Sequence, residues 1–166
     1  MIHNLTLVHL LLVGAAGGCI YLSLREVRRR YLSTWRLFAP ALLALFAATI
    51  LSLLQLVEGQ PRWLFGAALA TGFAVGAARG MMIGIRHDMY RPQVNLTDAA
   101  KLLLLWVAIA VGAAVAVECV AAFLDNPELE IFRLGAALVA VLCGSAMLGR
   151  ALLLTIRLHR ADRGGT

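Results

Sequence analysis

Three ionisable residues stand inside long apolar stretches of this sequence: Arg79, Glu118 and Arg150. A charged side chain within a membrane-spanning helix is costly, so residues of this kind favour contact with a substrate, an ion or a lipid. Arg79 and Arg150 are expected at roughly 8 and 10 Å from the nearest helix end. An arginine side chain can reach the interface from that depth. Snorkelling, or pairing inside the bundle, is therefore favoured for both arginines over contact with a substrate or an anionic lipid.

Glu118 has a shorter side chain, which cannot reach the interface as an arginine does. It must be protonated, solvated by a cavity or paired. Its candidate partners at a similar depth are His9, Gln55, Arg62 and Arg133. A pair of Glu118 with His9 could relay a proton, although a structural hydrogen bond is the favoured interpretation.

The histidines and cysteines do not follow the spacings typical of a metal or haem site. Of the histidines, only His87 and His159 could face each other from different helices, and both stand among charged residues typical of solvated segments. The sequence has no HxxxH spacing. The cysteines stand singly in apolar stretches, with no CxxC spacing: Cys19, Cys119 and Cys143. We therefore expect no cofactor, no metal and no catalytic residue, and hence a protein that is not an enzyme.

Four glycines at four-residue spacing form the strongest local signal: Gly72, Gly76, Gly80 and Gly84. On a helix this spacing gives a stripe without side chains, against which another backbone can pack closely. The partner can be a helix of the same chain or the same helix of a second subunit. Ser145 and Gly149 repeat the spacing of small residues in the last apolar stretch, so a partner within the chain is available.

Five long apolar stretches must position these residues. The 166 residues are 61% hydrophobic and 14% charged, which is more apolar than a soluble domain. A membrane crossing takes about 20 residues of helix. The stretches predict helices at about 5–24, 37–57, 62–85, 101–124 and 131–158. We expect an all-α polytopic bundle of five transmembrane helices, in a single integral membrane domain spanning residues 1–166.

The basic residues between these helices predict the orientation. Eleven Lys and Arg residues fall on one side of the predicted membrane, and only Arg62 and Arg133 fall on the other. Because positive residues are retained in the cytoplasm, the N-terminus is predicted outside and the C-terminus inside. The short turns at 58–61 and 125–127 predict antiparallel helix pairs, because so few residues cannot cross the bundle. Residues 86–100 are expected to form a longer loop.

The basic segments on the predicted cytoplasmic side are candidates for contact with anionic lipid headgroups or a partner protein. Their arginines and a tyrosine also fit ordinary interfacial anchoring. The residues concerned are Arg28, Arg29, Arg30, Arg86, Tyr90 and Arg91. The net charge of +6 is spread over short segments and not over one soluble face, so nucleic acid is not an expected partner. The predicted location is a bacterial inner membrane.

The chain resembles the CcdC-like group of bacterial membrane proteins, which take their name from a genetic neighbourhood with cytochrome c biogenesis. The resemblance lies in a basic stretch after the first helix (Arg25 to Arg36), a proline near the start of the second (Pro40), Arg79 with Gly80 near the end of the third, and Arg150 before a basic tail. It implies a multi-pass bacterial membrane protein. The group has no established activity or ligand that could be assigned to these positions.

Two functions from different classes fit these features. The first is a non-enzymatic accessory or assembly subunit, packed as a homo-oligomer or in a larger membrane complex through small-residue stripes and a basic cytoplasmic rim. The alternative is a small oligomeric channel or transporter in which Glu118, Arg79 and Arg150 line a path. A membrane enzyme or haem-handling protein is disfavoured, because the sequence lacks a nucleophile with a base, clustered ligands or a nucleotide-binding loop.

Overall fold

The computed structural model describes residues 7–28, 34–83, 85–88, 91–94, 98–124 and 129–163. These segments contain five α-helices and one β-hairpin. The helices are α1 (Leu7–Val27), α2 (Thr34–Val57), α3 (Arg62–Met82), α4 (Asp98–Leu124) and α5 (Glu130–Arg163), and the strands are β1 (Ile85–Asp88) and β2 (Arg91–Val94). By length and composition, all five helices can cross a membrane.

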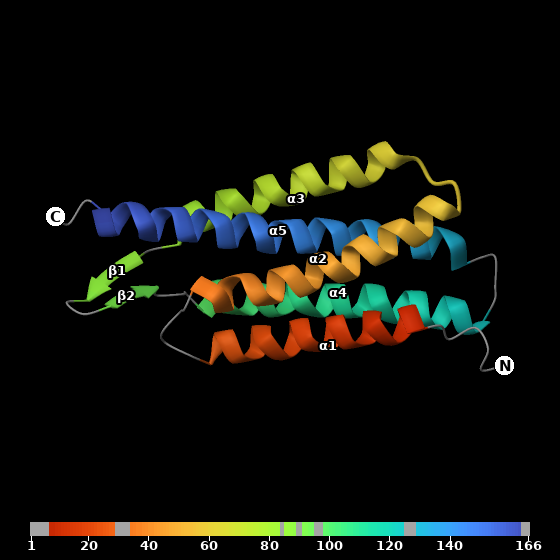
Figure 1. Cartoon of the computed structure of the whole chain (residues 1–166), viewed down its shortest axis with the longest axis horizontal. Helices are drawn as coiled ribbons and strands as arrows, with labels where there is room; N and C mark the ends of the chain where they lie inside the picture. The colour runs from red at the N-terminus through yellow and green to blue at the C-terminus, as the bar shows by residue number, and fades with distance from the viewer. Residues whose placement is uncertain are drawn as a thin grey trace.

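The helices run side by side, and successive helices point in opposite directions (Figure 1). One end of the bundle holds the start of α1 and the turn between α2 and α3; we call it the Glu58 end, after a residue in that turn. The other end holds the β-hairpin, the start of α4 and the end of α5, and we call it the hairpin end. Each helix therefore crosses the bundle once.

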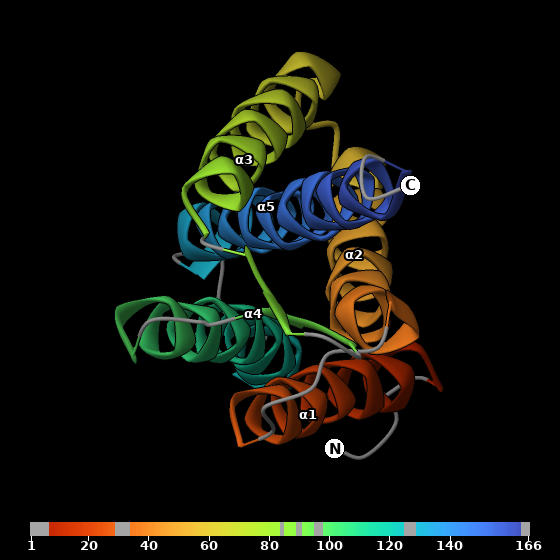
Figure 2. The same cartoon turned by 90° about the vertical axis from the view of Figure 1, so that its left-hand side faces the viewer.

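Helix α5 occupies the centre of the assembly. It packs against α3 on one side and against α2 and α4 on the other, while α1 closes the bundle by packing on α2 and α4 (Figure 2). The extensive contacts of α3 within the described part of the chain are with α5 alone. Four helices thus surround a shared core, and α3 is attached to the outside of it.

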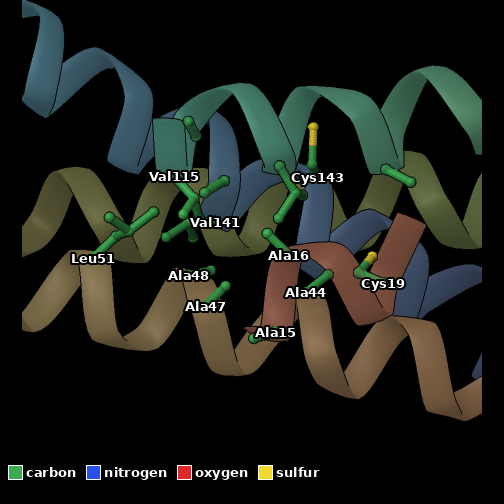
Figure 3. Close-up of a cluster of buried hydrophobic side chains, with 14 of the residues drawn as sticks. Ala15, Ala16, Cys19, Ala44, Ala47, Ala48, Leu51, Val115, Val141 and Cys143 are labelled. Carbon is green, nitrogen blue, oxygen red and sulfur yellow. The ribbon is translucent and has the colours of Figure 1, made fainter. Parts of the chain in front are cut away.

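The core between α1, α2, α4 and α5 is made mainly of small residues. Alanines are buried on all four helices, with a few larger aliphatic side chains between them. Figure 3 shows the alanines of α1 and α2 together with Leu51, Val115 and Val141. On α2 one line of buried positions recurs every three or four residues, with Pro40 and Ala47 buried beside it: Leu37, Ala41, Ala44, Ala48, Leu51 and Gln55. A Cβ atom on Gly144 of α5 would lie only 3.2 Å from the backbone of Ala44. Small side chains allow this close approach of helix backbones, as in other membrane bundles.

The turn between α2 and α3 has a defined geometry. Gly59 adopts a φ of 90°, a left-handed conformation that glycine reaches without strain. Its amide donates to the Leu56 carbonyl at 3.2 Å, and the Gln60 amide donates to the Gln55 carbonyl at 3.2 Å. This is the Schellman pattern, which satisfies carbonyls at a helix C-terminus. It ends α2 sharply and holds Glu58 one turn after Gln55.

The main departure from the sequence prediction lies in residues 83–98. The third helix was expected to reach residue 85, but it ends at Met82, because Ile83 is extended (φ −75°, ψ 121°). The segment expected to be a loop contains an antiparallel β-hairpin in which Ile85 pairs with Val94 and Asp88 with Arg91. Helix α4 begins at Asp98, three residues before its predicted start. Four-residue strands are too short to show a clear alternating pattern in the sequence.

Candidate functional site

The glycine row packs α3 against α5 within the chain. Gly72, Gly76 and Gly80 are all buried. A Cβ atom on Gly76 would collide with the backbone of Ala146, and one on Gly72 would collide with Ser145 and the Leu142 carbonyl. A Cβ atom on Gly80 would meet the Leu153 Cβ at 3.1 Å. The backbones of the two helices are therefore in direct contact along this row; Gly84 lies outside the described residues.

The opposite face of α3 is also built from small residues, but it is exposed. A Cβ atom on Gly66 would meet nothing within 4 Å. Ala67, Ala70, Thr71, Ala74 and Ala78 lie on the same side of the helix and are exposed as well. We call these six residues the outer face of α3. A helix surface exposed to lipid does not need such small residues, whereas a contact between two helices does.

A cluster of charged and polar side chains joins α2, α4 and α5 at the Glu58 end; we call its four residues, Gln55, Glu58, Glu118 and Arg133, the Arg133 cluster. The Arg133 guanidinium donates to Glu118 through Nη2 at 2.6 Å and through Nε at 3.1 and 3.2 Å. Its Nη1 donates to the Glu58 Oε1 at 2.6 Å. Gln55 donates from Nε2 to the Glu58 Oε2 at 3.0 Å.

The Arg133 cluster is largely buried, and its charges do not cancel. The side chain of Glu118 is only 3% exposed, whereas those of Arg133 and Glu58 are 22% and 30% exposed. Two carboxyl groups share one guanidinium, so with both of them ionised the four residues carry one net negative charge. Gln55 is 0% exposed, and its Oε1 has no hydrogen-bond partner among the described residues. The cluster therefore combines excess negative charge with a buried acceptor that has no donor among the described residues.

Of the four partners that the sequence suggests for Glu118, Arg133 donates to it directly. Gln55 belongs to the same cluster because it donates to Glu58, which is itself paired with Arg133. Arg62 is exposed at the start of α3, and His9 is buried on α1. The proton relay through His9 stays a prediction. Sequence reasoning missed Glu58, although its place three residues after Gln55 at a helix end is a usable signal.

A second buried ion pair lies toward the hairpin end. Arg150 of α5 donates from Nη2 to the Glu26 Oε1 of α1 at 2.6 Å, and the two side chains are 13% and 3% exposed. The Arg150 Nε and the Ser23 Oγ beside this pair are buried without partners in the described part of the chain. Arg150 was expected to pair inside the bundle or to snorkel, and it pairs. Its partner Glu26 was missed, because it stands in a stretch dominated by arginines.

Arg157 has a structural role that its place in the basic tail does not reveal. Its Nη1 donates to the carbonyls of Gly80, Met81 and Ile83 at 2.8, 2.9 and 2.8 Å. These are orphan carbonyls at the end of α3, where a cation is favoured by the helix dipole. The side chain therefore ties the end of α3 to α5 just before the β-hairpin begins.

The three ionisable residues predicted inside the helices are not brought together. Arg79 is exposed on α3. Glu118 is held by Arg133, and Arg150 is 17 residues further along α5, a distance of about 26 Å. The core between these two levels contains buried apolar residues such as Leu51, Val111 and Val141.

The other predicted contact residues lie mostly at the hairpin end. Arg28 is exposed just after α1. Arg86 and Arg91 lie in β1 and β2, opposite Gln93 and Asp88. Arg29, Arg30 and Tyr90 lie outside the described residues. Among the residues that the structure does describe, no three His, Cys, Asp or Glu side chains are placed to hold a metal ion.

No known protein family, curated protein or solved structure matches this chain.

Proposed function

We propose that this protein is a multi-pass integral membrane protein that acts as a non-enzymatic accessory or assembly subunit. The observation that carries the proposal is the outer face of α3. Within the described residues helix α3 makes its extensive contacts with α5, and its exposed side presents small residues where another helix can approach closely. A second transmembrane helix, from a partner protein or from another copy of this chain, is the occupant that this surface suits.

The arginines of α5 support a transmembrane placement of the bundle. Arg133 stands at the Glu58 end, and Arg157 stands 24 residues later, near the β-hairpin, a separation of about 36 Å. The hydrocarbon core of a bilayer is about 30 Å thick. Trp63 and Trp35, at opposite ends of the bundle, are 70% and 73% exposed, as residues of an interfacial aromatic belt would be. We propose that a bacterial inner membrane lies between these levels.

The excess of basic residues at the hairpin end supports a cytoplasmic location for that end. Arg28 and Arg160 are exposed there, where anionic lipid headgroups would attract them. The N-terminus is then outside the cytoplasm, and the C-terminus is inside.

Cysteine labelling tests this orientation. A membrane-impermeant maleimide added to intact cells is expected to label Glu130→Cys at the Glu58 end, but to label Arg160→Cys only after the membrane is permeabilised. Both positions are exposed, so the reagent can reach them once they face it. The unchanged chain measures the background from its three native cysteines. Labelling of Arg160→Cys in intact cells, without labelling of Glu130→Cys, would reverse the proposed topology.

The proposed function itself is tested by the mass and composition of the complex purified gently in native nanodiscs, with an absorption spectrum of the same sample. We expect a larger assembly whose formation is lost in Ala74→Leu, because a leucine on the outer face of α3 keeps a second helix away. Ala116→Leu, a matched change at an exposed alanine of α4, should leave the assembly intact.

Three outcomes would contradict this proposal. An assembly unaffected by Ala74→Leu would remove the role of the outer face of α3. A haem or pigment band would indicate cofactor chemistry. A colourless monomer or homo-oligomer that conducts ions or solutes would favour the channel or transporter alternative.

A further inference from the structure

We infer that the Arg133 cluster binds one monovalent inorganic cation, held by the amide oxygen of Gln55 and the carboxylate of Glu58. The inference does not depend on α3 or on any partner protein. It rests on three observations: the excess charge of the cluster, the buried Gln55 oxygen without a hydrogen-bond partner among the described residues, and the partial exposure of Glu58 and Arg133.

The charge balance calls for one positive charge. Every carboxylate oxygen of Glu58 and Glu118 accepts a hydrogen bond from Arg133 or Gln55, an arrangement that suits two ionised carboxylates, which have only acceptors to offer. One guanidinium balances only one of them. Arg62, four residues after Glu58, is exposed, and among the described residues no ion pair joins it to the cluster. One monovalent cation would make the cluster neutral.

The Gln55 amide shows where the cation would sit. Its Nε2 donates to Glu58, which fixes the orientation of the amide, because the reverse orientation would place Oε1 against a carboxylate oxygen. Oε1 is thereby left as a buried acceptor on a residue that is 0% exposed. An unsatisfied buried polar atom in a native structure calls for an explanation such as a bound ion or water.

Four hydroxyl groups of these helices meet no such difficulty. The hydroxyl groups of Thr49, Ser52, Thr71 and Thr155 each donate to the carbonyl four residues earlier. A hydroxyl can donate in this way, whereas an amide oxygen can only accept. Oxygen atoms of an amide and a carboxylate are the ligands that hard cations prefer. Gln55 Oε1 and Glu58 together therefore offer the right donor atoms beside the excess charge.

Glu58 and Arg133 form the side of the cluster that is open at the Glu58 end. The side chains of Glu58 and Arg133 are 30% and 22% exposed there, whereas Glu118 is closed off behind them. A divalent ion would reverse the charge imbalance without removing it. The described residues also contain no group of three acidic, histidine or cysteine side chains that would hold such an ion. A sodium or potassium ion carries the single positive charge that balances the cluster and does not call for such a group of ligands.

Thermal unfolding of the purified protein in detergent tests this site. The chloride concentration is held constant, and sodium or potassium replaces N-methyl-D-glucamine, a cation too large for the site. A ligand that binds only the folded state raises the unfolding midpoint with its concentration. We expect the midpoint to rise with sodium or potassium. In Glu58→Gln and Gln55→Leu the half-maximal concentration should increase about tenfold or more, the loss of one good ligand contact.

Glu130→Gln is the matched control, because Glu130 is an exposed glutamate at the same end, outside the Arg133 cluster; it should respond to the ions as the unchanged protein does. Each variant is compared with its own midpoint in N-methyl-D-glucamine, so a loss of stability does not affect the comparison. If Gln55→Leu fails to fold, Glu58→Gln decides, since that side chain is partly exposed. Equal midpoints of the unchanged protein in all salts would mean that only water occupies the site and would overturn the inference. Stabilisation by calcium or magnesium alone, or an ion effect that persists unchanged in Glu58→Gln, would overturn it as well.

Discussion

Gly76→Ala is expected to detach α3 from α5 while leaving the other four helices packed. A Cβ atom at this position would overlap the backbone of Ala146, which belongs to a helix and cannot move away as the end of a flexible side chain could. The two helices must therefore separate. Overpacking of this kind costs about 1–3 kcal/mol, and α3 has no second helix with which it makes extensive contact in the described structure. We expect faster amide hydrogen exchange in α3 and a lower unfolding midpoint, because the packing of α3 on α5 is lost.

Gly66→Ala is the matched control for this change, because it adds the same methyl group to the same helix. A Cβ atom there would meet nothing within 4 Å. Since alanine also favours a helix by up to about 1 kcal/mol over glycine, Gly66→Ala should be neutral or stabilising. Equal stability and equal exchange in the two variants would contradict the α3–α5 contact.

The sequence was sufficient to predict the helices, because each of them is a long apolar stretch flanked by polar residues. The glycine row also predicted a close backbone contact, but four-residue spacing cannot say which helix lies opposite. That choice depends on Ser145, Ala146 and Gly149 of α5, which meet the row only in the folded chain. The resemblance to CcdC-like proteins stays a prediction.

The charged sites were predicted only in part, for a physical reason. An isolated ionisable residue in an apolar stretch stands out, so Glu118 and Arg150 were found. Their partners Glu58 and Glu26 stand near helix ends, where charge is ordinary. Glu26 nevertheless continues the buried face of α1, after Leu12, Cys19 and Ser23 at intervals of three, four or seven residues. Extending that periodicity into the basic stretch would have indicated that Glu26 points inward.

Arg133→Leu is expected to be the most destabilising single change at the Glu58 end. It would leave the carboxylates of Glu58 and Glu118 without the guanidinium that they share, and the Glu118 side chain is only 3% exposed. Removing one partner of a buried pair costs about 3–5 kcal/mol, because the remaining charge is buried and uncompensated. Arg62→Leu, at an exposed arginine of the same end, is the control and should change the free energy of unfolding by about 0.5 kcal/mol or less.

The double variant Arg133→Leu with Glu118→Leu separates the charge effect from the loss of packing. Replacing both members of a buried ion pair by apolar residues is often neutral or stabilising. Glu58 is 30% exposed and can be hydrated at the end of the bundle. We therefore expect the double variant to recover most of the free energy of unfolding lost in Arg133→Leu. If both variants are equally unstable, Arg133 stabilises the fold through the packing of its aliphatic side-chain carbons between α2, α4 and α5. If Arg133→Leu alone is as stable as the unchanged protein, Glu118 has another means of carrying its charge in the fold.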